Sequence, residues 1–208
     1  SRICISTSTR KTTFCFRRPS NWRPKHSRLN EKSARRSIIQ NQQELDQLAA
    51  EVFHRLEQTG DVLVLAESCT AGLIAATLAR IPGMSRRLAG SFVVYQTVSK
   101  SAWLGISSDL IQQHDVVSPV VAETMAARAL DRTPHANIAI SITGHLGPDA
   151  PPGLDGVAWL ATVRRGCASV TNPPHLKSDS SGNSLSCRHD RQVDAVHQAL
   201  TGLLCFVP

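Results

Sequence analysis

The stretch VLVLAESCTAGLIAATLARIPG, residues 62–83, joins a short apolar run, a polar cluster and a run of small and aliphatic residues. Residues 61–66 are almost entirely apolar, which is typical of a strand buried on both faces. Residues 69–81 predict a helix that ends at Pro82 and Gly83. Ser68 therefore lies where a buried strand gives way to a helix.

The rest of the chain alternates helices with strands. Apolar spacing predicts helices over residues 44–56, 98–105, 107–115, 118–133 and 190–204, and strands over 88–96, 136–144 and 156–165. Ser118 and Pro119 are suited to the cap and the first position of a helix, and Gly90 predicts a bulge in its strand. Residues 166–186 give a poor strand signal. This order predicts an α/β fold, a three-layer sandwich in which helices flank a central, mostly parallel or mixed sheet.

The positive charge is concentrated at one end of the chain. The net charge is +7, but residues 1–40 hold 11 of the 23 Lys and Arg residues and one of the 16 acidic residues. This Ser-, Thr- and Arg-rich segment predicts a disordered basic tail outside a globular domain of residues 41–208. The tail is interpreted as an arm that contacts polyanions, as an organelle-targeting peptide, or as spurious sequence upstream of the true start. The third is favoured because the globular pattern begins abruptly at Asn41.

Composition excludes several function classes. The six cysteines form no C-x-x-C pair and show no zinc-like spacing to histidines, so we expect no metal and a reducing, cytoplasmic location. No apolar run approaches the roughly 20 residues that span a bilayer, so no membrane partner is expected. The body shows no basic stripe or aromatic stacking platform, so a nucleic acid partner is not expected either.

The polar cluster at residues 67–70 lies where ligands bind in open α/β sheets, at the carboxyl end of a strand. A serine oxygen attacking a carbonyl there would leave its oxyanion facing the unpaired N–H groups of the first helical turn. From these residues alone, the alternative that Ser68 or Thr70 only caps the helix is favoured.

A serine nucleophile also needs a base. The chain's only tyrosine, Tyr95, ends the second predicted strand, and Lys100 follows it. If this strand lies beside the first, a phenolate or a neutral amine could take the serine proton, provided that burial lowers the lysine pKa. The alternative is that Tyr95 is an amphipathic strand-end residue and Lys100 a solvated charge.

Three segments occur in an order that resembles a known family. They are AESCTAGLIAATLARIPGMSRRLAGSFVVYQTVSKSAWLGI (66–106), VVSPVVAETMA (116–126) and ISITGHLGP (140–148). Together they resemble the C-terminal domain of the CinA family, the nicotinamide-nucleotide amidases. The resemblance implies that a small-molecule nucleotide, nicotinamide mononucleotide, is hydrolysed to nicotinate mononucleotide and ammonia in pyridine nucleotide recycling. It implies a serine amidase that uses no cofactor, and a homo-oligomer is compatible with it.

The resemblance also implies roles for individual residues. Ser68 is the expected nucleophile, and Lys100, relayed by Tyr95, is the expected general base and then the acid to the leaving ammonia. Backbone N–H groups of Cys69 and Thr70 are expected to bind the oxyanion, and Glu67 to orient the helix start or a substrate hydroxyl. The substrate-binding positions are Glu67, Cys69, Thr70, Thr97, Thr143 and Gly144.

Some positions depart from the family pattern. Gln96 and Thr97 stand where Ser-Asn is usual, and Asp149 and Asp155 are poor neighbours for a phosphate. His145 is a candidate hydrogen-bond donor to the phosphate that would compensate for these two carboxylates. In the last helix, Arg188 or Arg191 could reach an anion.

These departures leave two alternatives open. Cys69 is an alternative nucleophile, because a thiol at a helix N-terminus has a lowered pKa. A non-catalytic nucleotide-binding or interaction module on the same fold is the alternative function.

Overall fold

The computed structural model describes residues 28–167, 169–172, 176 and 184–207. The chain divides into the units Ser1–Ile39 and Gln40–Pro208, and the sheet belongs to the second. Its strands are β1 (Leu63–Glu67), β2 (Leu88–Val93), β3 (Ile138–Gly144), β4 (Ala158–Arg164) and β5 (Val170–Asn172). The helices are α1 (Arg28–Thr59), α2 (Leu73–Leu78), the 3-10 helix η1 (Met84–Arg86), α3 (Thr97–Leu104), α4 (Ser108–His114), α5 (Pro119–Asp131) and α6 (Ser184–Phe206).

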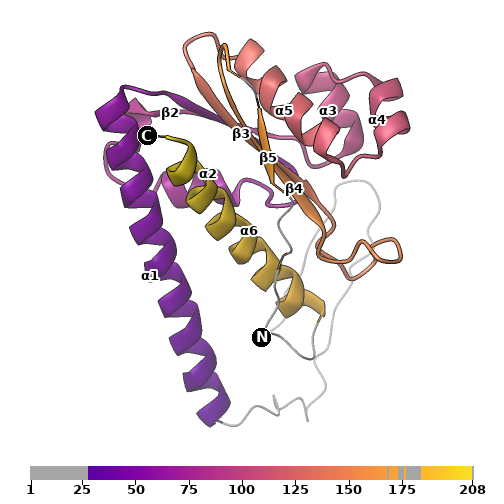
Figure 1. Cartoon of the computed structure of the whole chain (residues 1–208). Helices are drawn as coiled ribbons and strands as arrows, with labels where there is room; N and C mark the ends of the chain where they lie inside the picture. The colour runs from indigo at the N-terminus through magenta and orange to yellow at the C-terminus, as the bar shows by residue number, and fades with distance from the viewer. Residues whose placement is uncertain (1–27, 168, 173–175, 177–183, 208) are drawn as a thin grey trace, which may run out of the picture. The chain divides into compact units, whose positions relative to one another are not determined.

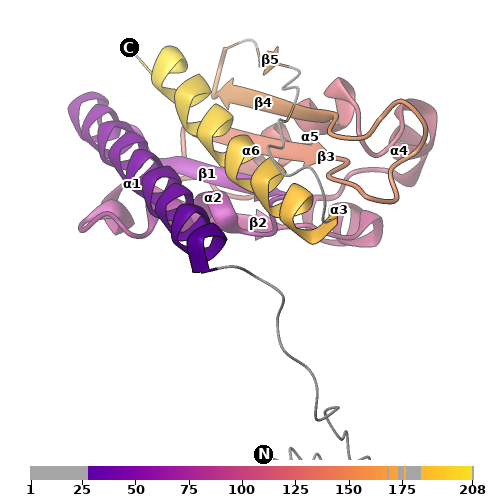
Figure 2. The same cartoon turned by 90° about the horizontal axis from the view of Figure 1, so that it is seen from below.

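The sheet is mixed, as the sequence predicts. Its strand order is β2-β1-β3-β4-β5 (Figure 2). Strand β1 pairs in parallel with both β2 and β3, whereas β4 runs antiparallel to β3 and to β5. Because β1, β2 and β3 are parallel, their carboxyl ends at Glu67, Val93 and Gly144 meet at one edge of the sheet.

Helices cover both faces of the sheet, which confirms the three-layer sandwich. One apolar core joins the sheet to α2, α6 and the part of α1 beyond Gln40, and a second core joins the sheet to α3, α4 and α5 (Figures 1 and 2). Strand β1 contributes alternate side chains to the two cores, Leu63 and Leu65 to the first and Val64 and Ala66 to the second. It is therefore buried on both faces, as its apolar run predicts.

Several local predictions are confirmed. Ser118 caps α5 by accepting a hydrogen bond from the Val121 N–H, and Pro119 is the first helical residue. Gly90 has a φ of 151° and lies at a register shift between β1 and β2, where Leu63 pairs with Leu88 and the next residue pairs with Gly90. The predicted bulge is present.

Other boundaries differ from the sequence-based ones. Helix α1 begins at Arg28, inside the segment predicted to be a disordered tail, because residues 28–42 contain no proline or glycine and are rich in residues with high helix propensity. Residues 1–27 of the predicted tail lie outside the described residues. Strand β5 was not predicted, since its three residues lie in a stretch dominated by serine and proline.

A buried ion pair occupies the opposite edge of the sheet. Asp61, only 2% exposed, accepts hydrogen bonds from both terminal nitrogens of Arg164 (2.8 and 2.9 Å), from Asn137 Nδ2 (2.6 Å) and from Thr59 Oγ1 (2.7 Å). Burial alone would raise the pKa of the Asp61 carboxyl, but these hydrogen bonds and the charge of Arg164 outweigh it. The pKa of Asp61 is therefore lowered.

We expect Arg164→Met to lower the free energy of unfolding by about 2–4 kcal/mol at neutral pH, because it leaves a buried carboxylate without its cation. Urea denaturation measures this change. The pKa of Asp61 is lowered in the folded chain, so the pair stabilises the fold fully only above the ordinary Asp pKa of 3.8. The loss in Arg164→Met should therefore shrink as the pH falls below 3.8 toward the lowered pKa of folded Asp61. In the control, Arg128→Met removes an exposed pair with Asp131 and should change stability by less than ~0.5 kcal/mol. Equal losses in the two variants would contradict the prediction.

Candidate active site

A cavity of about 320 Å³ opens where β1, β2 and β3 end. Its lining comes from the turn after β1, from the start of α3, from the loop after β3 and from α6. The lining includes every predicted site residue except Glu67 and Thr70: Ser68, Cys69, Tyr95, Thr97, Lys100, Thr143 and Gly144. Segments far apart in the sequence therefore converge at the edge predicted to bind a ligand.

Ser68 and Lys100 are in direct contact in this cavity. The Lys100 Nζ lies 2.8 Å from Ser68 Oγ and also donates to the Val94 carbonyl at 3.0 Å. Lys100 is only 1% exposed and Ser68 is 7% exposed. The alternative that Lys100 is a solvated helix charge is wrong, because α3 directs this side chain inward to the end of β1.

Burial changes the acid–base properties of Lys100. It lowers the pKa of the Lys100 amine to about 8, against a weaker opposing effect of the Cys69 thiol. No carboxylate of the described residues hydrogen-bonds to the ammonium form. A fraction of the amine is therefore neutral near physiological pH and can accept the proton of Ser68 Oγ.

Ser68 lies in a turn and does not cap a helix. Its N–H donates to the Ile142 carbonyl at 3.0 Å, which continues the pairing of β1 with β3. Ala71 (φ 53°) and Gly72 (φ 95°) adopt left-handed conformations, so the right-handed helix begins only at Leu73. The predicted helix over residues 69–81 is thus too long, and the interpretation of Ser68 or Thr70 as its cap is wrong.

Glu67 supplies the cap from the end of β1. Its fully buried carboxylate accepts hydrogen bonds from the backbone N–H groups of Ile74 and Ala75, both at 3.0 Å, in the first turn of α2. It also accepts from Thr70 Oγ1 (2.8 Å) and Ser91 Oγ (3.0 Å). The side chains of Glu67 and Thr70 therefore hold the turn in place behind the cavity, and the geometry supports the helix-orienting role of Glu67 over contact with substrate.

Cys69 is a poor alternative nucleophile. Burial raises the pKa of its thiol to about 12, although the nearby charges of Lys100 and Arg188 oppose the shift. The predicted reason for a lowered pKa is absent, because no helix begins at Cys69. Its carbonyl accepts a hydrogen bond from Gln192 Nε2 (3.2 Å) on α6, which fixes the turn from the other side.

Tyr95 lines the cavity but does not relay protons between Lys100 and Ser68. Its side chain is 53% exposed, and its hydroxyl accepts a hydrogen bond from Arg188 at 2.7 Å. Lys100 reaches Ser68 without an intermediate, so the predicted relay is not needed. Strand β2 ends at Val93, before Tyr95, and this leaves the phenol on a loop.

Thr143 and Gly144, at the end of β3, form part of the cavity lining. The buried Thr143 hydroxyl donates to the Val116 carbonyl at 2.9 Å, which ties the segment before α5 to the sheet. A Cβ on Gly144 would lie 2.6 Å from the Ala158 Cβ, so β3 and β4 approach too closely for any larger residue. The segment around Val116 and Val117 also lines the cavity and was not predicted to do so, although it begins one of the three segments that carry the family resemblance.

Residues 45–204 match the sequence model of the CinA C-terminal domain. The chain belongs to the CinA C-terminal domain family. It is 39% identical over 148 residues to a CinA-like protein from Mycolicibacterium vanbaalenii, and 42% identical over 112 residues to one from Myxococcus xanthus. These alignments cover 69% and 54% of this chain but only 34% and 26% of those proteins, so the chain spans about a third or less of each relative.

Solved CinA-family structures share the fold. A competence/damage inducible protein named CihA from Agrobacterium tumefaciens superposes with a TM-score of 0.71 at 29% identity, covering 78% of this chain and 94% of that one. A competence or damage-inducible protein from Enterobacter asburiae gives a TM-score of 0.71 at 26% identity, covering 79% and 98%.

The loop that departs from the usual CinA pattern is fixed by an ion pair. Arg191 forms two hydrogen bonds of 2.7 Å with Asp155, and its Nη1 also donates to the Leu146 carbonyl. Asp155, predicted to be a poor neighbour for a phosphate, is therefore neutralised. His145 lines the cavity, and its buried Nε2 has no hydrogen-bond partner among the described residues.

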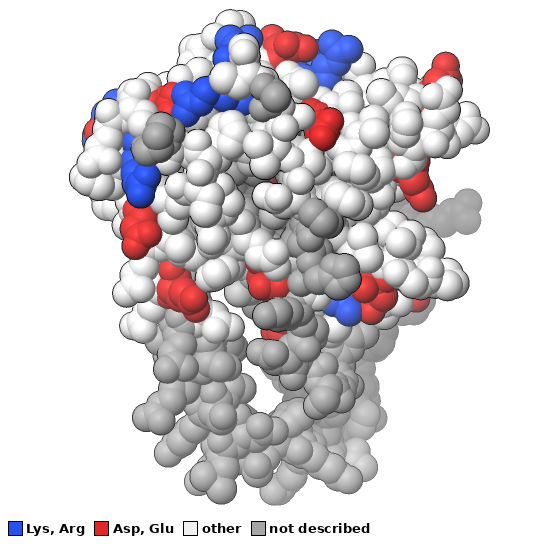
Figure 3. Space-filling view, viewed as in Figure 1, with Lys and Arg blue, Asp and Glu red and all other residues white. Residues whose placement is uncertain are grey.

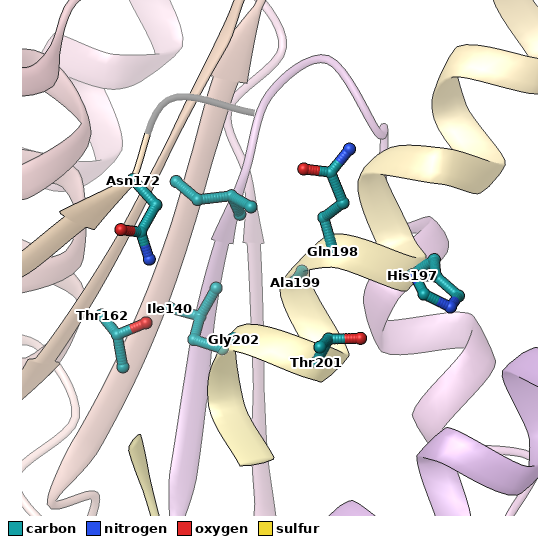
Figure 4. A pocket seen from close by; sticks show the side chains of 9 residues that line it. Ile140, Thr162, Asn172, His197, Gln198, Ala199, Thr201 and Gly202 are labelled. Carbon is teal, nitrogen blue, oxygen red and sulfur yellow. The ribbon is translucent and has the colours of Figure 1, made fainter. Parts of the chain in front are cut away.

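A second cavity of this CinA domain, about 300 Å³, lies between the sheet and α6 (Figure 4). Thr162 and Asn172 line it on the strand side, and Gln198, Ala199 and Gly202 on the helix side. Its one titratable side chain among the described residues, His197, contacts Glu44. Among the described lining residues no nucleophile and base are in contact, so we place the candidate active site in the cavity that holds Ser68.

The charge of the surface and the composition of the helices relate to the partners and the location expected from the sequence. On the face in Figure 3, basic and acidic side chains of the described residues are interspersed and form no continuous basic stripe. Within the described ranges, no helix is both long and apolar enough to cross a bilayer. The partner and cytoplasmic assignments from the sequence stay predictions.

Proposed function

We propose that this CinA-family chain is an amidohydrolase that converts nicotinamide mononucleotide to nicotinate mononucleotide and ammonia, with Ser68 as the nucleophile. The observation that carries the proposal is the contact of 2.8 Å between Lys100 Nζ and Ser68 Oγ inside a cavity. A serine hydroxyl paired with a buried amine of lowered pKa is an arrangement for nucleophilic catalysis.

Acylation follows from this pair. The neutral Lys100 amine accepts the Ser68 hydroxyl proton while Oγ attacks the carboxamide carbon and the carbonyl π electrons move to oxygen. When the tetrahedral intermediate collapses, the C–N bond breaks and the Lys100 ammonium donates its proton to the departing nitrogen. Ammonia leaves, and an ester joins the nicotinoyl group to Ser68.

Deacylation repeats the proton transfers with water. Lys100 takes a proton from a water molecule that attacks the ester carbon, and it returns the proton to Ser68 Oγ as the ester bond breaks. The products are the carboxylic acid, which ionises in solution, and the regenerated serine. No step requires an oxidant, a reductant or a metal.

The turn after β1 offers donors for the oxyanion. No backbone or side-chain oxygen of the described residues accepts a hydrogen bond from the backbone N–H groups of Cys69 and Thr70. Donors fixed next to the nucleophile stabilise the negative charge of the tetrahedral intermediate, which is usually a large contribution to acyl transfer. We assign the oxyanion site to these two groups.

The test is ammonia release by the full chain from nicotinamide mononucleotide, nicotinamide riboside, nicotinamide and glutamine. We expect the mononucleotide to be the preferred substrate, with a kcat on the order of 1–100 s⁻¹. If no amide in this panel releases ammonia while the nucleotide still binds, the proposal fails and the chain is a non-catalytic nucleotide-binding module.

A further inference from the structure

Arg188, near the start of α6, lines the cavity that contains Ser68 and Lys100. Its guanidinium donates to the Gly147 carbonyl at 2.6 Å and to the Tyr95 hydroxyl at 2.7 Å. Both acceptors are neutral. Among the described residues, no ion pair joins Arg188 to a carboxylate, so within that part of the chain its positive charge faces the cavity without a counter-ion.

The neighbouring Arg191 differs in this respect. Its guanidinium forms a bidentate pair with Asp155 and its side chain is only 12% exposed, so its charge is already balanced. Arg191 does not line the cavity. Of the two arginines that the sequence offers as anion contacts, the structure leaves only Arg188 available.

As far as the described residues go, Arg188 also retains donors for a ligand. A guanidinium has five N–H groups in a planar fork, and the two bonds to Gly147 and Tyr95 occupy only two of them. The two acceptors, Gly147 and Tyr95, lie on separate loops, and together they fix the orientation of the guanidinium fork. An oriented guanidinium with free donors is well suited to bind two oxygens of one phosphate or carboxylate.

We propose that Arg188 binds the phosphate monoester of the substrate whose amide is cleaved at Ser68. The inference rests on the proposed function for the amide end and adds the anion end of the same cavity. The volume of about 320 Å³ is within the range of small-ligand sites, so one molecule can contact both ends. Tyr95 assists as a positioning residue, because its hydroxyl accepts from Arg188 and keeps its own proton to donate to the anion.

One lining residue opposes this binding. Asp149 is exposed and lies in the same cavity wall, and no ion pair with a described residue neutralises it. A carboxylate there repels a dianion, and salt screens this repulsion. Phosphate binding should therefore depend on Arg188 in particular, since Arg191 is already paired.

The experiment is calorimetric titration of the full chain with ribose 5-phosphate and with ribose, at low ionic strength. We expect ribose 5-phosphate to bind and Arg188→Gln to weaken its binding by about 10- to 100-fold, as expected for the loss of a charged hydrogen-bonding partner. Arg188→Lys should recover part of the affinity, because it restores the charge without the fork. The control Arg128→Gln removes an exposed arginine that does not line the cavity and should bind like the unmodified chain.

Kinetics separate this inference from the proposed function. If the amidase activity holds, Arg188→Gln should raise the KM for nicotinamide mononucleotide by about 10- to 100-fold and change kcat/KM for nicotinamide riboside less than threefold. Equal losses with both substrates, or unchanged ribose 5-phosphate binding in Arg188→Gln, would overturn the role of Arg188. If no amide is cleaved but ribose 5-phosphate binding still requires Arg188, the anion site stands and only the amidase proposal fails.

Discussion

Ser68→Ala is expected to reduce kcat for ammonia release from nicotinamide mononucleotide by at least about 10,000-fold, because no acyl-enzyme can form without the hydroxyl. Substrate binding should change little, since the removed atom contacts Lys100 and the cavity contains other polar groups. Calorimetric titration of the variant with the nucleotide, next to the ammonia assay, measures both quantities.

Cys69→Ala is the matched control for this experiment. The two residues are adjacent, but the Cys69 thiol is buried and its pKa is about 12, so almost none of it is thiolate at neutral pH. We expect its replacement to lower activity less than tenfold. Activity that survives Ser68→Ala and is lost in Cys69→Ala would reverse the assignment of the nucleophile.

Lys100→Met is expected to lower kcat/KM by about 1,000-fold or more and to raise the stability of the fold. Methionine keeps the length and apolar character of the stem but removes the base that activates Ser68. The buried amine has a pKa of about 8 in place of 10.5, so keeping it protonated costs the fold roughly 3 kcal/mol at neutral pH. Denaturation and ammonia assays on the same sample measure these opposite changes.

The pH dependence gives a second signature of Lys100. The rate should rise with pH and level off above about 8, because only the neutral amine accepts the proton. Between pH 8 and 10.5 the unfolded chain binds more protons at this position than the folded chain, so the stability of the unmodified protein should rise over that interval. The stability advantage of Lys100→Met should therefore be greatest below pH 8 and decline above it. If Lys100→Met kept its activity, or if the rate of the unmodified protein did not rise as the pH approached about 8 from below, the role of Lys100 as base would be contradicted.

The fold could be predicted from the sequence wherever burial sets a clear pattern. The apolar run of β1 and the capped, amphipathic α5 are examples, because each has a single arrangement that buries its apolar side chains. The length of α2 could not be predicted, since the left-handed Ala71 and the capping carboxylate of Glu67 are consequences of tertiary packing. Short β5 lacks the apolar residues that would have revealed it.

The candidate site was predictable only in part. The sequence named Ser68 and Lys100, but their contact depends on β2 lying beside β1, and periodicity does not determine which strands are neighbours. The contact of Arg188 with Tyr95 depends on how α6 packs, which no local pattern specifies. The position of Glu67 behind the cavity likewise follows from the turn at residues 68–72. The sequence pattern predicted helix for this turn from residue 69 onward.

That turn has a consequence for the speed of the reaction. Ile142 holds it at its first residue, Gln192 at its second, and Glu67 holds the helix that follows. The attacking oxygen thus has few orientations to give up when it meets a carbonyl, and little entropy remains to be lost on the way to the transition state. A free alcohol in solution loses this orientational entropy in every reaction. Ser68 loses it once, when the polypeptide folds, and not again at each turnover.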